Sequence, residues 1–208
     1  LAGRFVSGGW SVKAMHRLMV NSEVYRQSSS AAGREGAAAI DAGNRLLWRM
    51  NPRRLDAESL HDAVLAVSGN LNRTMFGPGY RDFDYREEYA PVYSYTTPDR
   101  PELWRRSIYR FVVRTTAHPL LTTLDCPNPA NLTPSRSVTT TALQSLALLN
   151  NAFMQQQAGS FAARVREEAG PDPGAQTLRA FALAFGRLPE PAEKTAAVNL
   201  IKARGMEQ

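Results

Sequence analysis

The sequence is poor in the residues that build reactive centres. Its 208 residues contain one cysteine and three histidines. An internal disulfide is therefore excluded, and a Cys-x-x-Cys-His heme motif is absent. His16, His61 and His118 lie far apart in the sequence, whereas a metal site needs three or four converging ligands. Because phosphate-binding and nucleophile motifs are also missing, we predict no catalytic residue and no cofactor in this chain.

Long apolar runs are missing as well. No segment approaches the ~18 consecutive apolar residues of a membrane-spanning helix, so we expect no membrane span. The first residues lack the basic and apolar regions of a secretory signal peptide, and the sequence begins at Leu1. We expect a fragment of a longer protein that is truncated at its N-terminus, with any export signal upstream.

Lysine is scarce, and arginine supplies nearly all of the positive charge behind the net charge of +6. Arginine favours bidentate recognition of carboxylate and phosphate groups. The basic residues are scattered along the chain, however, and no zinc finger, RNA-binding signature or recognition helix is present. The sequence therefore does not predict a nucleic-acid partner.

Apolar residues recur at helical spacing along most of the chain, which is 43% hydrophobic. The strongest pattern follows Asp56, a natural N-cap residue. These signals predict one mainly α-helical, irregular multi-helix domain over residues 1–208. The predicted helices cover residues 10–27, 41–50, 56–72, 102–116, 142–157, 160–168, 175–185 and 191–203.

The predicted helices at residues 142–157 and 102–116 differ in how clearly the sequence indicates them. Thr141 and Gln144 form a capping-box pattern, and the helix that follows is apolar over most of its girth, so we predict that it is the central core helix. Residues 102–116 fit a helix, but Tyr109, Phe111 and Val113 also alternate as in a strand. Length favours the helix, which would align Arg106, Arg110 and Arg114 on one face.

Two segments are expected to be irregular. Residues 28–40 are small and polar and predict a flexible internal loop. Residues 76–101 contain five tyrosines among several prolines and glycines, which predicts one long Tyr/Pro-rich loop with a possible short strand at residues 92–96. Loops of this length are usually functional or disordered, and the tyrosines favour order because they can pack against the helices.

Several segments resemble one known family in order and spacing. They are Gly9–Ser22, Tyr25–Gln27, Asn44–Arg49, Arg53–Leu60, Arg105–Tyr109, Thr139–Asn150 and the Phe-Gly-Arg-x-Pro motif from Phe185. The family is the planctomycete-specific C-terminal domain of unknown function (domain of unknown function 1553 type). It is found in exported proteins that often also carry a c-type cytochrome domain. The resemblance implies an extracytoplasmic, multidomain setting, with other domains of the same polypeptide as partners.

The predicted site is the polar, proline-rich loop that lies within residues 105–154, between two apolar segments. Asp125 follows one apolar segment, and Arg136 lies before the next. Together with Arg106 and Arg110 they would form either a buried ion-pair network or an anion site that binds a ligand. Cys126 is interpreted as a small apolar filler rather than a nucleophile.

An acidic stretch at residues 82–88 offers a weaker alternative. Calcium takes 6–8 oxygen ligands, often from loops. This stretch lacks the glycine and closing glutamate of an EF-hand, and Arg81 and Arg86 can neutralise it. The calcium candidates are Asp82, Asp84, Glu87 and Glu88.

From these features we expect a binding or assembly module within a large exported multidomain protein, with an extracellular glycan or protein as a possible partner. The alternative is a hydrolase-like enzyme domain that acts on extracellular polysaccharide. An enzyme should show a concave pocket with convergent acids of perturbed pKa. A binding module should show an exposed aromatic or apolar patch.

Overall fold

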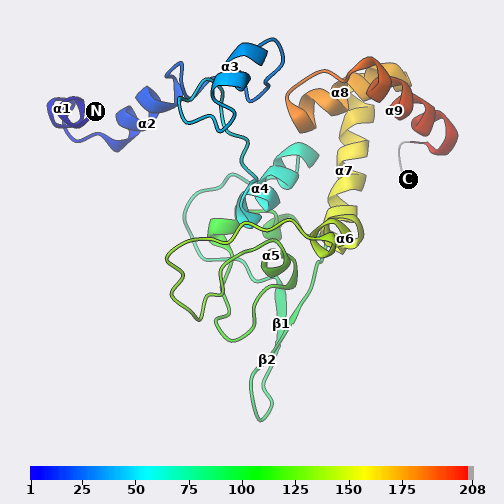
Figure 1. Ribbon diagram of the computed structural model, residues 1–208. Coiled ribbons are helices and arrows are strands. Elements are labelled where there is room, and N and C mark those ends of the chain that lie inside the picture. The colour runs from blue at the N-terminus through cyan, green and yellow to red at the C-terminus, as the bar shows by residue number, and fades with distance from the viewer. Residues whose placement is uncertain (206–208) are drawn as a thin grey trace. The chain divides into compact units, whose positions relative to one another are not determined.

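The computed structural model describes residues 1–205 and separates into two compact units, Leu1–Arg54 and Leu55–Gln208. The prediction of a mainly α, irregular multi-helix fold is confirmed: the described residues form nine α-helices and a single two-stranded sheet (Figure 1). The helices of the first unit are α1 (Ala2–Ser7), α2 (Val12–Val20) and α3 (Glu35–Ile40).

Side-chain hydrogen bonds set the helix limits in the first unit. Ser11 caps α2 by accepting a bond from the backbone N–H of Ala14. The predicted helix at 41–50 is wrong, because Asp41 accepts bonds from two following backbone N–H groups and Asn44 bonds to the backbone of Arg49. Such short-range side-chain bonds offer the backbone an alternative to the helix. The helix α3 instead lies at the end of the 28–40 segment.

The second unit is organised around two helices. α4 (Ala57–Ser68) packs against α7 (Ala152–Ala169). Leu65 on α4 and Val165 on α7 have no exposed surface, and the buried hydroxyl of Ser68 on α4 donates to the side-chain oxygen of Gln157 on α7. The chain then continues into α8 (Pro173–Phe185) and α9 (Pro191–Arg204), as the sequence predicted, with α8 packed on α7 and α9 on α8.

A second apolar cluster joins α4 to α5 (Pro119–Thr123) and α6 (Ala142–Asn150). The capping box at Thr141 is confirmed. The prediction that this helix is the central core helix is wrong, because α6 adds the partly buried Ala147 and Leu148 to this cluster while much of its apolar surface is exposed. The helix also ends early, at Asn150. The side chain of the next residue, Asn151, caps α7 by accepting from the N–H of Phe153. Three leucines of α6 are exposed: Leu143, Leu146 and Leu149.

The long Tyr/Pro-rich segment contains a hairpin of β1 (Phe83–Arg86) and β2 (Val92–Tyr95), paired antiparallel with Tyr85 opposite Tyr93. The predicted strand is confirmed, and its partner was missed. In Figure 1 the hairpin projects from the rest of this unit.

The predicted helix at 102–116 is also wrong. Only two short 3₁₀ turns form there, η1 (Pro101–Leu103) and η2 (Ser107–Tyr109). The backbone around them bonds to distant residues instead, in bridges between Asn72 and Arg105 and between Tyr80 and Arg110. The three arginines at 106, 110 and 114 therefore do not share a helix face.

Candidate functional site

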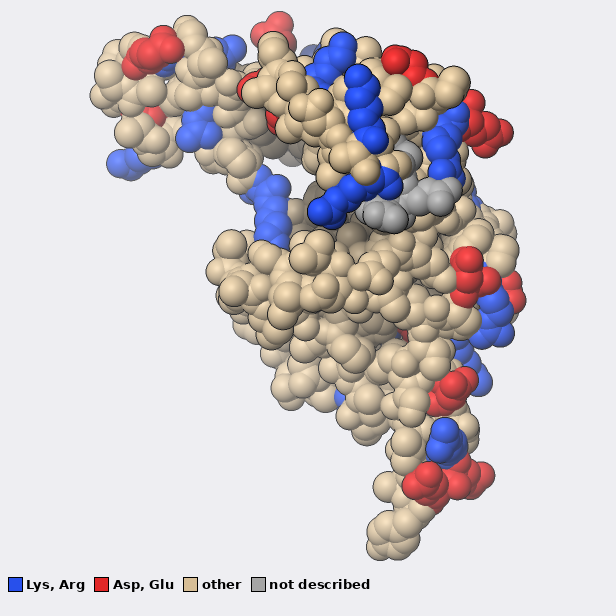
Figure 2. All heavy atoms as spheres, turned by 90° about the vertical axis from the view of Figure 1, so that its right-hand side faces the viewer, with Lys and Arg blue, Asp and Glu red and all other residues tan. Residues whose placement is uncertain are grey.

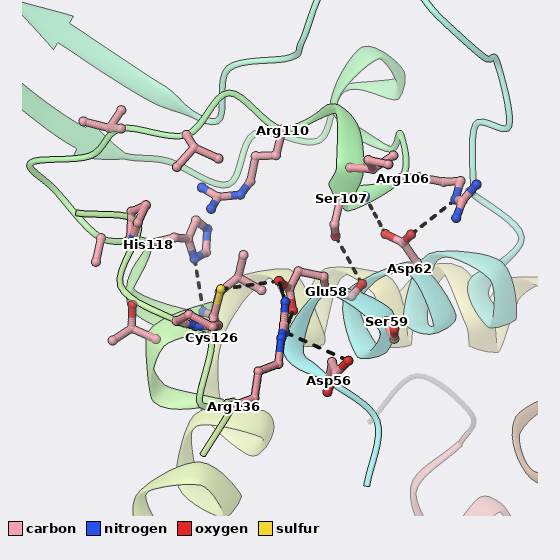
Figure 3. Close-up of a pocket in the computed structure, with 18 of the residues that line it drawn as sticks. Asp56, Glu58, Ser59, Asp62, Arg106, Ser107, Arg110, His118, Cys126 and Arg136 are labelled. Carbon is pink, nitrogen blue, oxygen red and sulfur yellow. Dashed lines mark hydrogen bonds and ion pairs between the residues drawn. The ribbon is translucent and has the colours of Figure 1, made fainter. Parts of the chain in front are cut away.

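A polar cleft of about 510 Å³ opens in the second unit. Its wall is formed by the start of α4, the segment around η2, and the loop that follows α5. Figure 3 shows side chains from all three elements converging on the same space. The charged and polar residues that line it are Asp56, Glu58, Ser59, Asp62, Tyr95, Arg106, Ser107, Arg110, His118, Thr122, Cys126 and Arg136.

One side of the cleft is closed by a bidentate ion pair. The guanidinium of Arg136 donates to both carboxylate oxygens of Glu58, at 2.7 and 2.8 Å. This pairing outweighs burial and holds the pKa of Glu58 below its usual range. Cys126 donates weakly to the same carboxylate. Burial and that negative charge raise the pKa of the thiol, so Cys126 is not an activated nucleophile.

We expect a modest coupling between these two groups. A double-mutant cycle with Glu58→Gln and Arg136→Met should give an interaction energy of about 1 kcal/mol or less, because both side chains keep contact with water. Since the folded-state pKa of Glu58 is lowered, its contribution is present above the unfolded pKa and is lost as the pH falls through the folded value. Urea titrations of the four proteins at pH 7 and at acid pH measure the coupling. An energy that stays constant on acidification would contradict the assignment.

One turn further along α4, the cleft wall holds a hydrogen-bonded group around Asp62. The carboxylate of Asp62 accepts from the backbone N–H of Ser107 and lies 3.6 Å from Nε of Arg106. Burial opposes its ionisation, but the bonds from His61 and Ser107 together lower its pKa.

This group does not form a catalytic triad. Nδ1 of His61 lies 3.0 Å from the hydroxyl of Ser107 and 3.5 Å from the carboxylate of Asp62. In a triad the base bonds the nucleophile with one ring nitrogen and the carboxylate with the other. Here a single nitrogen faces both groups, so the arrangement does not activate Ser107.

A buried charged cluster lies behind the cleft. The side chain of Arg110 is only 10% exposed, and its Nη1 is 3.9 Å from the carboxylate of Asp82. Nε2 of His118 is 3.4 Å from the same carboxylate. Within the described residues, Nη1 of Arg110, Oδ1 of Asp82 and the hydroxyl of Tyr80 have no hydrogen-bond partner.

Burial controls the ionisation of this cluster. It raises the pKa of Asp82 against the opposing effect of Arg110. Burial and the nearby Arg110 charge lower the pKa of His118 to about 4. Nδ1 of His118 accepts a bond from the N–H of Leu121, so the neutral ring carries its proton on Nε2, which faces Asp82. Asp82 does not line the cleft but a smaller cavity of about 60 Å³ that shares His118 with it.

Three of the four predicted ligand-binding residues lie together. Arg106, Arg110 and Arg136 all line the cleft, whereas Asp125 does not. The side chain of Asp125 accepts bonds from Thr139 and Gln144, which tie the turn after α5 to the start of α6. The sequence missed Glu58, Asp62 and His118 as cleft residues, because no local signal shows which distant arginines a carboxylate on α4 will meet.

The calcium hypothesis is not supported by the geometry. The described residues contain no group of three or more His, Cys, Asp or Glu side chains placed to hold a metal ion. Asp82 is largely buried beside Arg110, while Asp84 lies on β1 opposite Ser94. Glu87 and Glu88 follow β1 and are exposed. Figure 2 shows acidic and basic side chains mixed along the hairpin, not an acidic cluster of its own.

Comparisons with known proteins place the chain in a family but do not supply a reaction. No curated protein and no solved structure matches it. None of the helices in residues 1–205 has both the length and the apolar character needed to cross a membrane. A family model described as "Protein of unknown function (DUF1553)" matches residues 1–201, nearly the whole sequence. The chain therefore belongs to the DUF1553 family.

Proposed function

We propose that this chain is a binding module of a larger exported, multidomain protein, and that the cleft of its second unit binds an acidic carbohydrate through a carboxylate group. The observation that carries the proposal is Arg110. Its side chain lines the cleft and is nine-tenths buried. Its Nη1 faces Asp82 behind the cleft at 3.9 Å and forms no hydrogen bond, so the guanidinium is incompletely satisfied. A ligand carboxylate that reaches the guanidinium from the cleft would add an acceptor, and the arginine fork matches its geometry.

The rest of the lining suits a ligand rich in hydroxyl groups. Ser59, Ser107, Thr122 and Tyr95 offer hydroxyls, and Asp62 offers carboxylate oxygens. Small-molecule sites usually measure about 300–1,000 Å³ and orient their ligands with a few well-placed polar groups. A cleft of about 510 Å³ has room for a short saccharide.

The state of the acids favours binding over hydrolysis. A glycosidase needs one carboxylic acid with a raised pKa as proton donor beside an ionised partner. In this cleft the pKa values of Glu58 and Asp62 are both shifted downward. Asp82, whose pKa is raised, lies behind His118 and outside the lining. Neither Glu58 nor Asp62 therefore has the raised pKa of a proton donor, which supports binding over hydrolysis.

Replacement of Arg110 should weaken recognition of the ligand carboxylate in the cleft. We expect Arg110→Met to weaken binding of an oligogalacturonate tetramer at least tenfold, because the ligand carboxylate loses its bidentate partner. Isothermal titration calorimetry measures the affinity, with a neutral galactose tetramer as the comparison ligand. Arg114→Met is the matched control, since Arg114 is exposed and outside the cleft lining.

Two results would overturn the proposal. One is equal affinity for the acidic and neutral tetramers. The other is an equal loss of affinity in the Arg110 and Arg114 variants. Thermal unfolding of each variant separates a loss of binding from a loss of fold.

A further inference from the structure

The net positive charge of the chain lies in its first unit. Residues 1–54 contain nine basic residues (Lys and Arg) and three acidic residues (Asp and Glu), which gives a net formal charge of +6. Residues 55–208 contain sixteen basic and sixteen acidic residues, so their net formal charge is zero. The whole excess of positive charge thus lies on the smaller unit. Such an excess attracts acidic surfaces and repels a second copy of the same unit.

The same unit carries an apolar groove of about 1000 Å³. Leu18 and Met19 of α2 form part of its wall, and the chain after α2 adds Val24 and Tyr25. All four side chains are exposed. Exposed apolar patches of this kind on a folded protein usually mark an interaction surface.

Basic side chains lie beside this apolar surface. Arg4 of α1 and Arg17 of α2 both line the groove and are exposed. Within residues 1–205, neither guanidinium forms an ion pair. The groove therefore combines an apolar wall with two uncompensated positive charges.

We propose that this groove binds an amphipathic helix of a partner protein, with an apolar stripe in the groove and acidic side chains beside Arg4 and Arg17. The surface combines apolar side chains of α2 and the following chain with Arg4 and Arg17, which matches the apolar stripe and acidic flank of an amphipathic helix, a known partner in peptide recognition. An anionic membrane surface is the alternative occupant, and the vesicle measurement below distinguishes the two. The like charge of the unit disfavours a second copy. This surface is separate from the carbohydrate cleft, so either proposal can fail alone.

A designed helix provides the probe. It is an 18-residue peptide with leucines at i, i+3, i+4 and i+7 spacing and glutamates beside them; a matched peptide carries lysine in place of every glutamate. We expect the glutamate peptide to bind the full chain at least tenfold more tightly than the lysine peptide in fluorescence anisotropy. The affinity should fall as salt is added.

Variants test the assigned residues. Leu18→Asp should weaken the glutamate peptide at least tenfold, and Arg17→Glu severalfold; both residues are at the surface, and circular dichroism verifies that helix content is kept. Arg114→Glu, in the second unit, is the matched charge control and should leave the affinity unchanged. Arg110→Met should also leave it unchanged, which separates this test from that of the cleft.

Four results would overturn the proposal. They are equal binding of the two peptides, no effect of either groove variant, binding of phosphatidylglycerol vesicles without binding of the peptide, and self-association of the chain that Leu18→Asp abolishes. The third result would identify a membrane surface as the occupant, and the fourth a second copy.

Discussion

Leu65→Ala should lower the free energy of unfolding of the second unit by about 3 kcal/mol. Leu65 has no exposed surface and lies on α4, which packs along α7. The substitution removes buried apolar atoms and leaves a cavity that rigid neighbouring helices can fill only in part, for which a typical cost is about 2–5 kcal/mol. Because alanine has a high helix propensity, the lower free energy of unfolding measures the lost side-chain packing and not a weaker helix.

Urea unfolding followed by far-ultraviolet circular dichroism measures this effect, and the m-value should stay unchanged. Leu143→Ala on α6 is the matched control. Its side chain is exposed, so the same chemical change should cost less than about 0.5 kcal/mol. Similar losses in the two variants would contradict the core described here.

Acidification should destabilise the protein through His118. The pKa of this buried ring is lowered to about 4 from an ordinary value near 6.5. Between these values the unfolded chain binds a proton that the folded chain does not, so the folded state loses stability as the pH falls. A shift of this size corresponds to about 3 kcal/mol between pH 7 and pH 4.

The charged groups around His118 have opposite effects on the loss of stability at acid pH. Arg110 repels the protonated ring and strengthens the effect, and His61 acts in the same direction. Asp82 has a raised pKa, so the folded protein takes up a proton there more readily, and this uptake offsets part of the loss on acidification. A comparison with a variant that keeps Asp82 therefore isolates the contribution of His118.

His118→Asn is that variant, because asparagine can still accept the capping bond that Nδ1 accepts from the N–H of Leu121. Free energies of unfolding measured from pH 7 to pH 4 should fall more steeply for the wild type, by about 3 kcal/mol over the range. Parallel curves for the two proteins would show that His118 titrates normally and that the buried cluster is more open to water than described.

The sequence predicted helix ends correctly where a side chain bonds to the backbone of its near neighbours. The capping box at Thr141 forms as predicted, and the Ser11 hydroxyl caps α2 through a bond of the same local kind. The last helix begins at Pro191 as predicted, while α8 begins at Pro173, two residues before its predicted start. Each of these features needs only residues three or four positions apart.

The predicted helix at residues 102–116 is wrong because contacts with distant residues decide the structure there. Its apolar spacing fits a helix, but Ser107 donates its backbone N–H to Asp62 on another element, and Tyr80 pairs with Arg110. These distant partners satisfy the backbone groups that a helix would have used, so tertiary contacts override the local pattern.

The sequence by itself determined the helical class, most helix starts and the arginine-rich character of the site. Tertiary structure alone decided which carboxylate each arginine meets: Glu58 and Arg136 are 78 residues apart and bond directly, while Asp125 bonds to Thr139 and Gln144 instead of lining the cleft. Helix signals depend on neighbours within one or two turns, which the sequence displays. Ion pairs depend on how α4, η2 and the loop after α5 pack, and that arrangement follows from the burial of apolar side chains throughout the unit.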